Sequence, residues 1–119
     1  MLYLDADLLV LKNLEDIFEI DMKGHPIAAV MDTDNQSFNS GVLLIDNGLW
    51  KRENMTEQLV NETNGSLQQA LEGNIPKFNG DQTIFNKVFR DRWLALDKRM
   101  NLQVGHDVTA FMSHWPNHI

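Results

Sequence analysis

Two short, wholly apolar runs restrict the folds open to this chain more than any other feature. They are residues 27–31 (IAAVM) and 42–45 (VLLI). Each has the length of a strand that is buried on both faces rather than on one. Apolar strands of this kind, separated by helical patterns, are typical of α/β proteins in which helices cover a largely parallel sheet. The sequence therefore predicts an α/β fold with a mainly parallel sheet.

The rest of the chain supplies the other elements of such a fold. Short apolar segments predict two further strands, at residues 2–4 and 93–96. Apolar side chains at helical spacing predict four helices, at residues 13–18, 53–61, 66–71 and 82–90. Asn13 and Asp81 are placed to cap the first and the last helix. Asn-Gly pairs at residues 47–48 and 64–65 predict a turn and a break between the second and third helices.

Two carboxylates follow the first predicted strand. Asp5 and Asp7 stand one residue apart in the run Y-L-D-A-D, with apolar residues on both sides. Side chains alternate along an extended strand, so the two would point the same way and could share one divalent cation. Like charges in an apolar segment are costly without a cation between them, which favours a metal site. A solvated acidic loop is the simpler alternative, and the similar pair Asp32 and Asp34 opens into such a loop.

Two further motifs each have a structural and a functional interpretation. Asn39 and Ser40, followed by a glycine, precede a buried strand and form either a turn or an amide site that binds hydroxyls. Asp81 and Gln82 open a helix. In the structural interpretation Asp81 caps the helix and Gln82 is simply exposed. In the functional interpretation the N-terminus of the helix faces a ligand, which the amide of Gln82 contacts. Taken alone, each pattern favours the structural interpretation.

Composition excludes several classes of protein. The 119 residues suit one domain, and the absence of cysteine excludes disulfides and thiolate sites. A formal net charge of −7 disfavours nucleic acid and anionic membranes as general partners. Because no apolar run could span a membrane and no basic leader precedes the first strand, we expect a cytoplasmic protein, free or at the inner face of the membrane.

Motifs of several common enzyme classes are missing. The sequence has no G-x-G-x-x-G, no G-x-x-x-x-G-K-[ST] and no H-E-x-x-H. The four histidines, His25, His106, His114 and His118, show no familiar metal-binding interval. The last two are four residues apart, but the proline between them opposes a helix.

The order of the motifs along the chain resembles glycosyltransferase family 8. They are Y-L-D-A-D, A-A-V-M-D, F-N-S-G-V-L-L-I-D followed by a tryptophan, G-D-Q-x-x-x-N and W-L-A-L-D-x-R-x-N. The likeness runs from Leu2 to about Asn101, and it includes the bacterial general-stress and lipopolysaccharide galactosyl- or glucosyltransferases. We therefore expect residues 1–119 to form one partial glycosyltransferase domain, with residues 102–119 as an irregular tail.

The resemblance implies a GT-A fold with a Rossmann-like sheet and the transfer of a hexose, with retention, to a hydroxyl of a glycan or lipopolysaccharide-type acceptor. The implied donor is UDP-galactose or UDP-glucose, and the implied cofactor is Mn²⁺ or Mg²⁺. Asp5 and Asp7 match the metal ligands of the family. Asp32 and the Asn39 motif, which includes Ser40, match residues that contact sugar. Asp81 and Gln82 match a pair in which the aspartate binds donor hydroxyls and the glutamine amide lies by the anomeric carbon.

Two parts of the family pattern are not found. A strand-helix-strand unit that holds the nucleotide normally precedes the Y-L-D-A-D motif, and a histidine in H-x-x-G-x-x-K-P-W is the third metal ligand. His106 and His114 do not match that histidine. We therefore expect weak metal binding, little transfer by this chain alone, and self-association through exposed sheet edges. The alternatives are a non-catalytic α/β module that binds sugar or a partner, and a metal-dependent phosphohydrolase.

Overall fold

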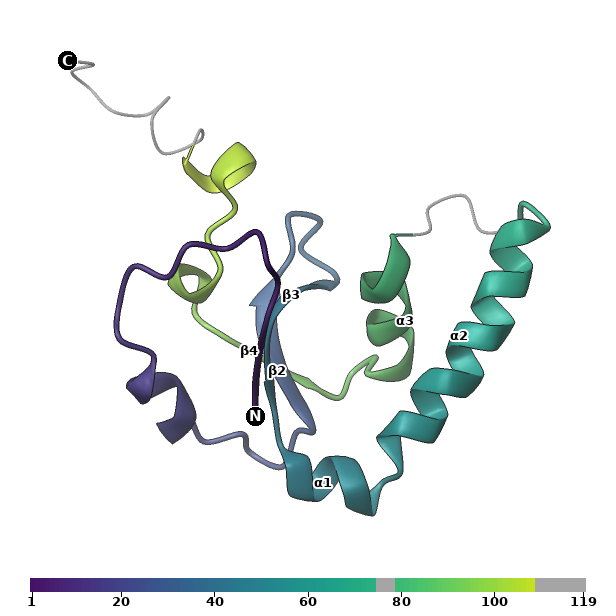
Figure 1. Ribbon diagram of the computed structural model, residues 1–119, viewed down its shortest axis with the longest axis horizontal. Helices are drawn as coiled ribbons and strands as arrows, with labels where there is room; N and C mark the ends of the chain where they lie inside the picture. Colours follow the sequence, from purple (N-terminus) through teal and green to yellow (C-terminus); the bar gives the residue numbers. More distant parts are fainter. Residues whose placement is uncertain (75–78, 109–119) are drawn as a thin grey trace.

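A mixed four-stranded sheet forms the centre of the computed structural model, which describes residues 1–74 and 79–108 (Figure 1). The strands are β1 (Leu2–Leu4), β2 (Ile27–Met31), β3 (Phe38–Ile45) and β4 (Trp93–Ala95). They lie in the order β1-β3-β2-β4, and β3 is antiparallel to both of its neighbours. Only the pairing of β2 with β4 is parallel among the described strands.

The α/β class is confirmed, whereas the expectation of a largely parallel sheet is wrong. The reason lies in the connection between β2 and β3, which consists of residues 32–37 alone. A parallel pair needs a crossover of a dozen or more residues, so a connection this short forces the two strands to run antiparallel. The parallel pairing of β4 with β2 is made after a long excursion that contains all three α-helices.

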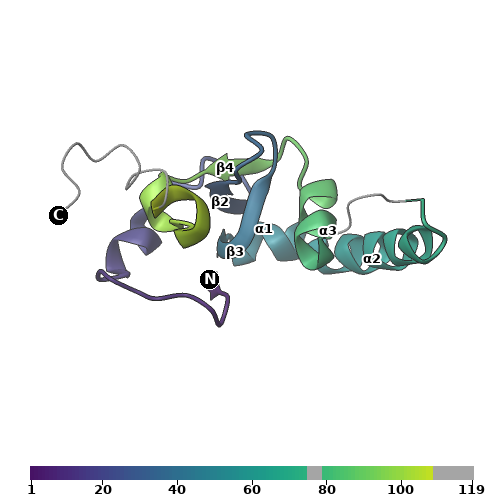
Figure 2. The same cartoon turned by 90° about the horizontal axis from the view of Figure 1, so that it is seen from above.

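Helical elements lie on both sides of the sheet (Figure 2). They are η1 (Glu15–Glu19), α1 (Asn47–Arg52), α2 (Met55–Leu71), α3 (Gly80–Val88), η2 (Lys98–Met100) and the π-helical turn η3 (Val104–Val108). Helix α3 packs on β3, and α2 packs on α3, so these two helices form successive layers on one side. The short helix η1 lies on the opposite side of the sheet and buries Ile17. None of the described helices is long and apolar enough to cross a membrane.

The main core lies between the sheet and the α-helices. Alternate residues of β2 and β3 supply it from the sheet, as the pleat requires. Its buried members are Ile27, Ala29, Phe38, Leu43, Ile45, Met55 and Phe89. Trp50 and Trp93 pack against this cluster, with Trp50 at 5.6 Å from Phe89 and Trp93 at 5.1 Å from Phe38, both measured between ring centroids.

Several predicted boundaries are wrong. The predicted turn at residues 47–48 is instead the start of α1, because the carboxylate of Asp46 accepts a hydrogen bond from the backbone N–H of Leu49 and caps that helix. The predicted break at residues 64–65 lies inside α2, which is continuous. Helix α3 begins at Gly80 with Asn79 as its N-cap, so Asp81 lies in the first turn rather than at the cap.

Helix α2 continues through Gly65 because tertiary contacts outweigh its low propensity. A glycine inside a helix costs about 1 kcal/mol relative to alanine. The next residue, Ser66, is 1% exposed, and its hydroxyl donates to Glu62 at 2.6 Å. The ammonium of Lys87 on α3 donates to the same hydroxyl at 2.8 Å. These bonds fix the second half of α2 against α3.

Part of the tail predicted to be irregular, residues 104–108, is ordered as a π-helical turn, and residues 109–119 lie outside the described part of the chain. Residues 104–108 form η3, and the carboxylate of Asp107 accepts hydrogen bonds from the ammonium of Lys98 and the backbone N–H of Gln103, each at 2.8 Å. His106 contacts the same carboxylate at 3.2 Å. His114 and His118 lie outside the described residues.

Candidate active site

The polar residues singled out in the sequence meet at one edge of the sheet. Because β1 and β2 are both antiparallel to β3, their carboxyl ends lie at the edge where β3 begins. Asp5 directly follows β1, and Asp32 directly follows β2. Asn39 and Ser40 belong to the start of β3. Asp5 and Asp32 therefore stand at the carboxyl ends of their strands.

The start of β3 is bulged at the F-N-S-G motif. Ala29 of β2 pairs with Leu43, but Met31 pairs with Phe38, so β3 advances five residues while β2 advances two. The amide oxygen of Asn39 accepts a hydrogen bond from the backbone N–H of Gly41 at 2.9 Å, which closes the bulge on itself. Bulges re-aim side chains next to active sites, and here the bulge supplies three consecutive residues to the cluster.

Asp5 and Asn39 approach each other over Gly41. The backbone N–H of Asp5 donates to the carbonyl oxygen of Gly41 at 2.9 Å. A Cβ atom placed on Gly41 would lie 2.9 Å from the amide oxygen of Asn39 and 3.2 Å from a carboxylate oxygen of Asp5. Only a residue without a side chain leaves room for both groups. This is the physical reason for glycine at this position.

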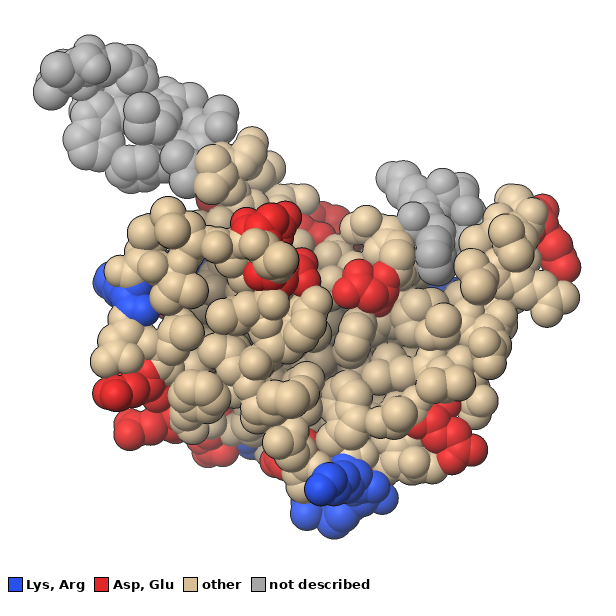
Figure 3. All heavy atoms as spheres, in the orientation of Figure 1, with Lys and Arg blue, Asp and Glu red and all other residues tan. Residues whose placement is uncertain are grey.

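Acidic side chains gather around the hydroxyl of Tyr3. This hydroxyl donates to the carboxylate of Asp5 at 2.7 Å, and that bond is the main cause of a raised pKa for Tyr3. Repulsion from the charge of Asp5 raises the pKa further, and the charges of Asp81 and Asp7 add to it. Figure 3 shows several acidic side chains close together in the upper middle of the face in view. Among the described residues, no lysine or arginine forms an ion pair with these three carboxylates.

The backbone at Asp7 differs from the one predicted. Strand β1 ends at Leu4, and residues 6–7 form a turn, so side-chain alternation along a strand does not govern Asp5 and Asp7. Their carboxylates are both close enough to influence Tyr3, and Asp7 is exposed. Within residues 1–74 and 79–108, no group of three or more histidine, aspartate or glutamate side chains is arranged to hold a metal. The described residues therefore supply no third protein ligand for a metal beside Asp5 and Asp7.

A second group joins the carboxylate of Asp32 to two glutamines. The side-chain amide of Gln82 donates to one oxygen of Asp32 at 2.5 Å, and that of Gln103 donates to the other at 3.0 Å. The amide oxygen of Gln82 accepts from the backbone N–H of Ser40 at 3.2 Å. Asp32 and Gln82, which are 50 residues apart in sequence, are thus linked to each other and to the bulge. Asp81 precedes this network and accepts from the backbone N–H of Gln82 at 2.9 Å.

Three amide side chains complete the site and were given no role from the sequence. Asn101 is 7% exposed and donates to the amide oxygen of Asn39 at 2.8 Å. Asn86 binds both backbone groups of Phe38, accepting from its N–H at 2.9 Å and donating to its carbonyl at 2.8 Å. The third is Gln103. Asn86 and Asn101 are the final residues of two motifs quoted above, so the motifs held the signal, whereas no pattern marks Gln103.

Comparisons with known proteins agree with this arrangement. The family model described as "Glycosyl transferase family 8" matches residues 1–115, which extends beyond the limit near residue 101 expected from the motifs. Glycosyltransferase GlyD of Streptococcus pneumoniae is 46% identical over 119 residues, which cover all of this chain and 15% of GlyD. General stress protein A of Bacillus subtilis is 28% identical over 116 residues and is covered to 39%.

A solved structure has the same fold. The crystal structure of glycosyltransferase GlyE from Streptococcus pneumoniae superposes with a TM-score of 0.75 at 35% identity. The match covers 92% of this chain and 27% of GlyE. The chain therefore spans between about one seventh and two fifths of the lengths of these three relatives.

Proposed function

Since this chain belongs to glycosyltransferase family 8, we propose that it carries the donor-sugar half of a metal-dependent, retaining transferase. The proposed reaction moves a hexose from a UDP-sugar, galactose or glucose, to a hydroxyl group of a saccharide acceptor. The observation that carries the proposal is the convergence of two groups of side chains on residues 39–41. Asp5 and Asn39 meet over Gly41, and Asp32 and Gln82 are bound to each other and to Ser40.

The acidic cluster supports a divalent cation between the protein and a diphosphate. Carboxylate oxygens are the ligands that Mn²⁺ and Mg²⁺ take, and the charges of Asp5 and Asp7 lie near one tyrosine with no ion-paired cation among the described residues. A bound cation would stabilise the charge that develops on the departing nucleotide. Asp5 and Asp7 are the residues proposed to hold it.

The second group supports recognition of the sugar. One oxygen of Asp32 accepts from Gln103 and from the backbone N–H of Thr33, and the other accepts from Gln82 alone, so the second oxygen keeps a lone pair for a sugar hydroxyl. Asn39 is held in the same way by Asn101 and by the backbone N–H of Gly41. Groups that are fixed before the ligand arrives lose little conformational freedom on binding. We propose that Asn39, Ser40 and Asp81 bind donor hydroxyls and that Asp32 binds sugar hydroxyls on the side of the acceptor.

Gln82 is proposed to act at the reacting carbon. Its amide oxygen carries a partial negative charge, and the backbone N–H of Ser40 holds it in place. Such an oxygen stabilises the positive charge of an oxocarbenium-like transition state without forming a bond, because a neutral amide is a poor nucleophile. Asp81 is the neighbouring carboxylate, so a glycosyl adduct trapped on Asp81 would contradict this front-face route.

Calorimetry tests the metal assignment. Titration of this chain with Mn²⁺ and UDP together should show binding that Asp5→Asn and Asp7→Asn each weaken. Asp16→Asn, a change at an exposed aspartate of η1, is the matched control and should bind as the wild type does. Equal binding by all four proteins would remove the assignment. A chain that binds sugar but neither Mn²⁺ nor UDP would instead support the non-catalytic binding module.

The donor is identified by activity. Release of UDP from a panel of UDP-hexoses, measured on the complete product of the gene, should be metal-dependent and highest with one sugar. Release that continues unchanged in a chelator would refute metal dependence.

A further inference from the structure

A polar cavity of about 760 Å³ opens beside α3, next to the proposed sugar site. One wall of this cavity is formed by residues three or four apart in sequence between positions 79 and 90. This spacing places them on a single face of α3 and of the residues that adjoin its two ends. They are Asn79, Gln82, Thr83, Asn86, Lys87 and Arg90. The opposite walls come from the loop between β2 and β3 and from Glu62 of α2. We call this cavity the α3 groove.

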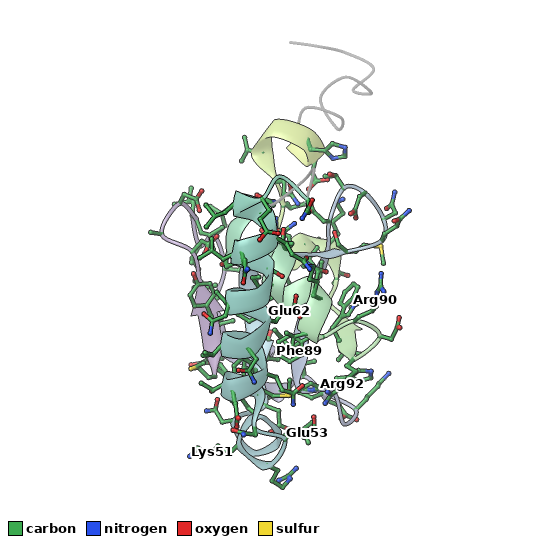
Figure 4. All side chains as sticks on the ribbon, turned by 90° about the vertical axis from the view of Figure 1, so that its right-hand side faces the viewer. Lys51, Glu53, Glu62, Phe89, Arg90 and Arg92 are labelled. Atoms are coloured by element: carbon green, nitrogen blue, oxygen red, sulfur yellow. The ribbon has the colours of Figure 1, made fainter. Side chains whose placement is uncertain are left out.

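The α3 groove begins at the site and runs away from it. Asp32 and Gln82, which are hydrogen-bonded to each other in the proposed sugar site, also line the groove. Arg90 lies just beyond the C-terminal end of α3, eight residues after Gln82. Figure 4 shows Arg90 at the surface beside the ribbon, while its neighbour Phe89 turns into the core. A ligand in the groove would therefore extend from the reacting end outward.

The lining limits the class of ligand. None of the lining side chains is aliphatic or aromatic, and the methyl of Thr83 and the stems of Lys87 and Arg90 add apolar surface on which a sugar ring can lie. Three carboxylates and two cations line the groove, and Lys87 is 3.4 Å from the carboxylate of Glu62 and largely neutralised by it. This balance disfavours phosphates and other anions. Alternating carboxylates, amides and hydroxyls instead suit a neutral molecule with many hydroxyl groups.

The walls of the α3 groove are already fixed. The carboxylate of Asp34 accepts from the backbone N–H groups of Gln36 and Ser37 at 2.9 Å and from the hydroxyl of Ser37 at 2.7 Å, which holds the loop in shape. Asn86 is fixed by the backbone of Phe38. Arg90 is exposed, and its guanidinium is left for a ligand, since it forms no hydrogen bond or ion pair with any described residue.

We propose that the α3 groove binds a neutral oligosaccharide acceptor. Its reacting sugar lies at Asp32 and Gln82, and a sugar further from the reacting end accepts hydrogen bonds from Arg90. This inference rests on the proposed function for the identity of the ligand as an acceptor. It adds that the acceptor is recognised over at least two sugar units, on a face of α3 that carries no donor or metal residue besides Gln82.

Solution NMR of this chain tests the inference with simple probes. Lactose, cellobiose and maltose would each be titrated into labelled protein in the tens of millimolar, with glucose and galactose as single-sugar controls. We expect at least one disaccharide to shift the backbone amides of residues 82–90 more strongly than either monosaccharide. Arg90→Ala should raise the dissociation constant about tenfold, the effect of losing one hydrogen bond from a charged donor.

Two further variants sharpen the result. Arg52→Ala removes an exposed arginine from α1 and should leave disaccharide binding unchanged. Arg90→Lys keeps the charge but removes the two-pronged donor, so binding should fall between wild type and Arg90→Ala. The inference is overturned if no disaccharide shifts residues 82–90, or if Arg90→Ala binds as tightly as the wild type.

The outcome is separable from that of the donor site. If Mn²⁺ and UDP bind at Asp5 and Asp7 but no disaccharide enters the α3 groove, this inference fails and the proposed function stands. If disaccharides bind in the groove while Mn²⁺ and UDP do not bind, the groove stands as a saccharide site and the transferase proposal fails.

Discussion

Replacing Gly41 with alanine should damage both the stability and the ligand binding of this chain. The new Cβ atom would lie 2.9 Å from the amide oxygen of Asn39, a distance that real Cβ contacts essentially never show. It would also lie 3.2 Å from the carboxylate of Asp5. Asn39 must move to relieve the contact, and the backbone of a buried strand offers little room for an alternative adjustment.

The size of the effect follows from the bonds that Asn39 would lose. Its amide oxygen accepts from Gly41 at 2.9 Å and from Asn101 at 2.8 Å. Losing both costs about 2 kcal/mol. The reduced freedom of the unfolded chain returns about 0.5–1 kcal/mol. We therefore expect a net loss of about 1–1.5 kcal/mol, which corresponds to a decrease in Tm of about 5 °C for a domain of this size.

Thermal and urea unfolding, followed by the fluorescence of the core-packed Trp50 and Trp93, would measure this loss. Gly65→Ala is the matched control. Gly65 lies inside α2 with no atom within 4 Å of an added Cβ, so the same substitution there should stabilise the protein by up to about 1 kcal/mol. If Gly41→Ala proves as stable as wild type and still binds Mn²⁺ and UDP, the crowding argument for residues 39–41 is refuted.

Three other perturbations test separate parts of the structure. Gln103→Ala removes one donor to Asp32 and should lower the free energy of unfolding by about 1 kcal/mol, whereas Gln69→Ala on the exposed face of α2 should not lower it; equal urea midpoints for these two variants would contradict the role of Gln103. A hydrogen bond from Lys98 lowers the pKa of Asp107 to about 2, so its contribution to stability is present above the ordinary value of 3.8 and is lost as the pH falls toward about 2. The difference in urea midpoint between wild type and Asp107→Asn should therefore be constant at neutral pH and should narrow over that window, and a difference independent of pH would be inconsistent with this ion pair. The outer edge of β1 has no strand partner among the described residues, with Met1 58% and Tyr3 42% exposed, so light scattering should detect self-association at high concentration; a strictly monomeric chain would contradict it.

The sequence predicted three of the four strands well because their signal is local, whereas β3 begins at Phe38, four residues before the apolar run 42–45. Residues 27–31 and 93–95 were placed within a residue of their observed bounds, since continuous apolar runs depend little on neighbours. Strand direction was predicted incorrectly, because the length of the connection between β2 and β3 decides it and the apolar pattern does not. Helix α2 was divided wrongly, because Ser66, Glu62 and Lys87 form contacts that no local pattern reveals.

The candidate site was predictable only through the ordered motifs. Asp5, Asp32, Asn39 and Gln82 do lie together, although their patterns taken singly favoured structural roles. Residues that hold these side chains from a distance escaped notice. Gln103 reaches Asp32 across 71 residues of sequence, in a segment whose composition marks no element. Supporting contacts of this kind arise from tertiary packing, so no periodic pattern in the sequence predicts them.

The short segment with Asn101 and Gln103 gives the site an unusual assembly order. Asn39 and Asp32 are translated early, but the amides that hold them emerge 62 and 71 residues later. A nascent chain can thus complete its sheet before the last hydrogen bond to each of these two side chains has formed. In the finished protein, a brief detachment of residues 98–108 would remove one hydrogen bond from each of these side chains, while Gln82 still binds Asp32 and the backbone N–H of Gly41 still binds Asn39. Ligand affinity would then be governed by a local opening equilibrium rather than by global unfolding.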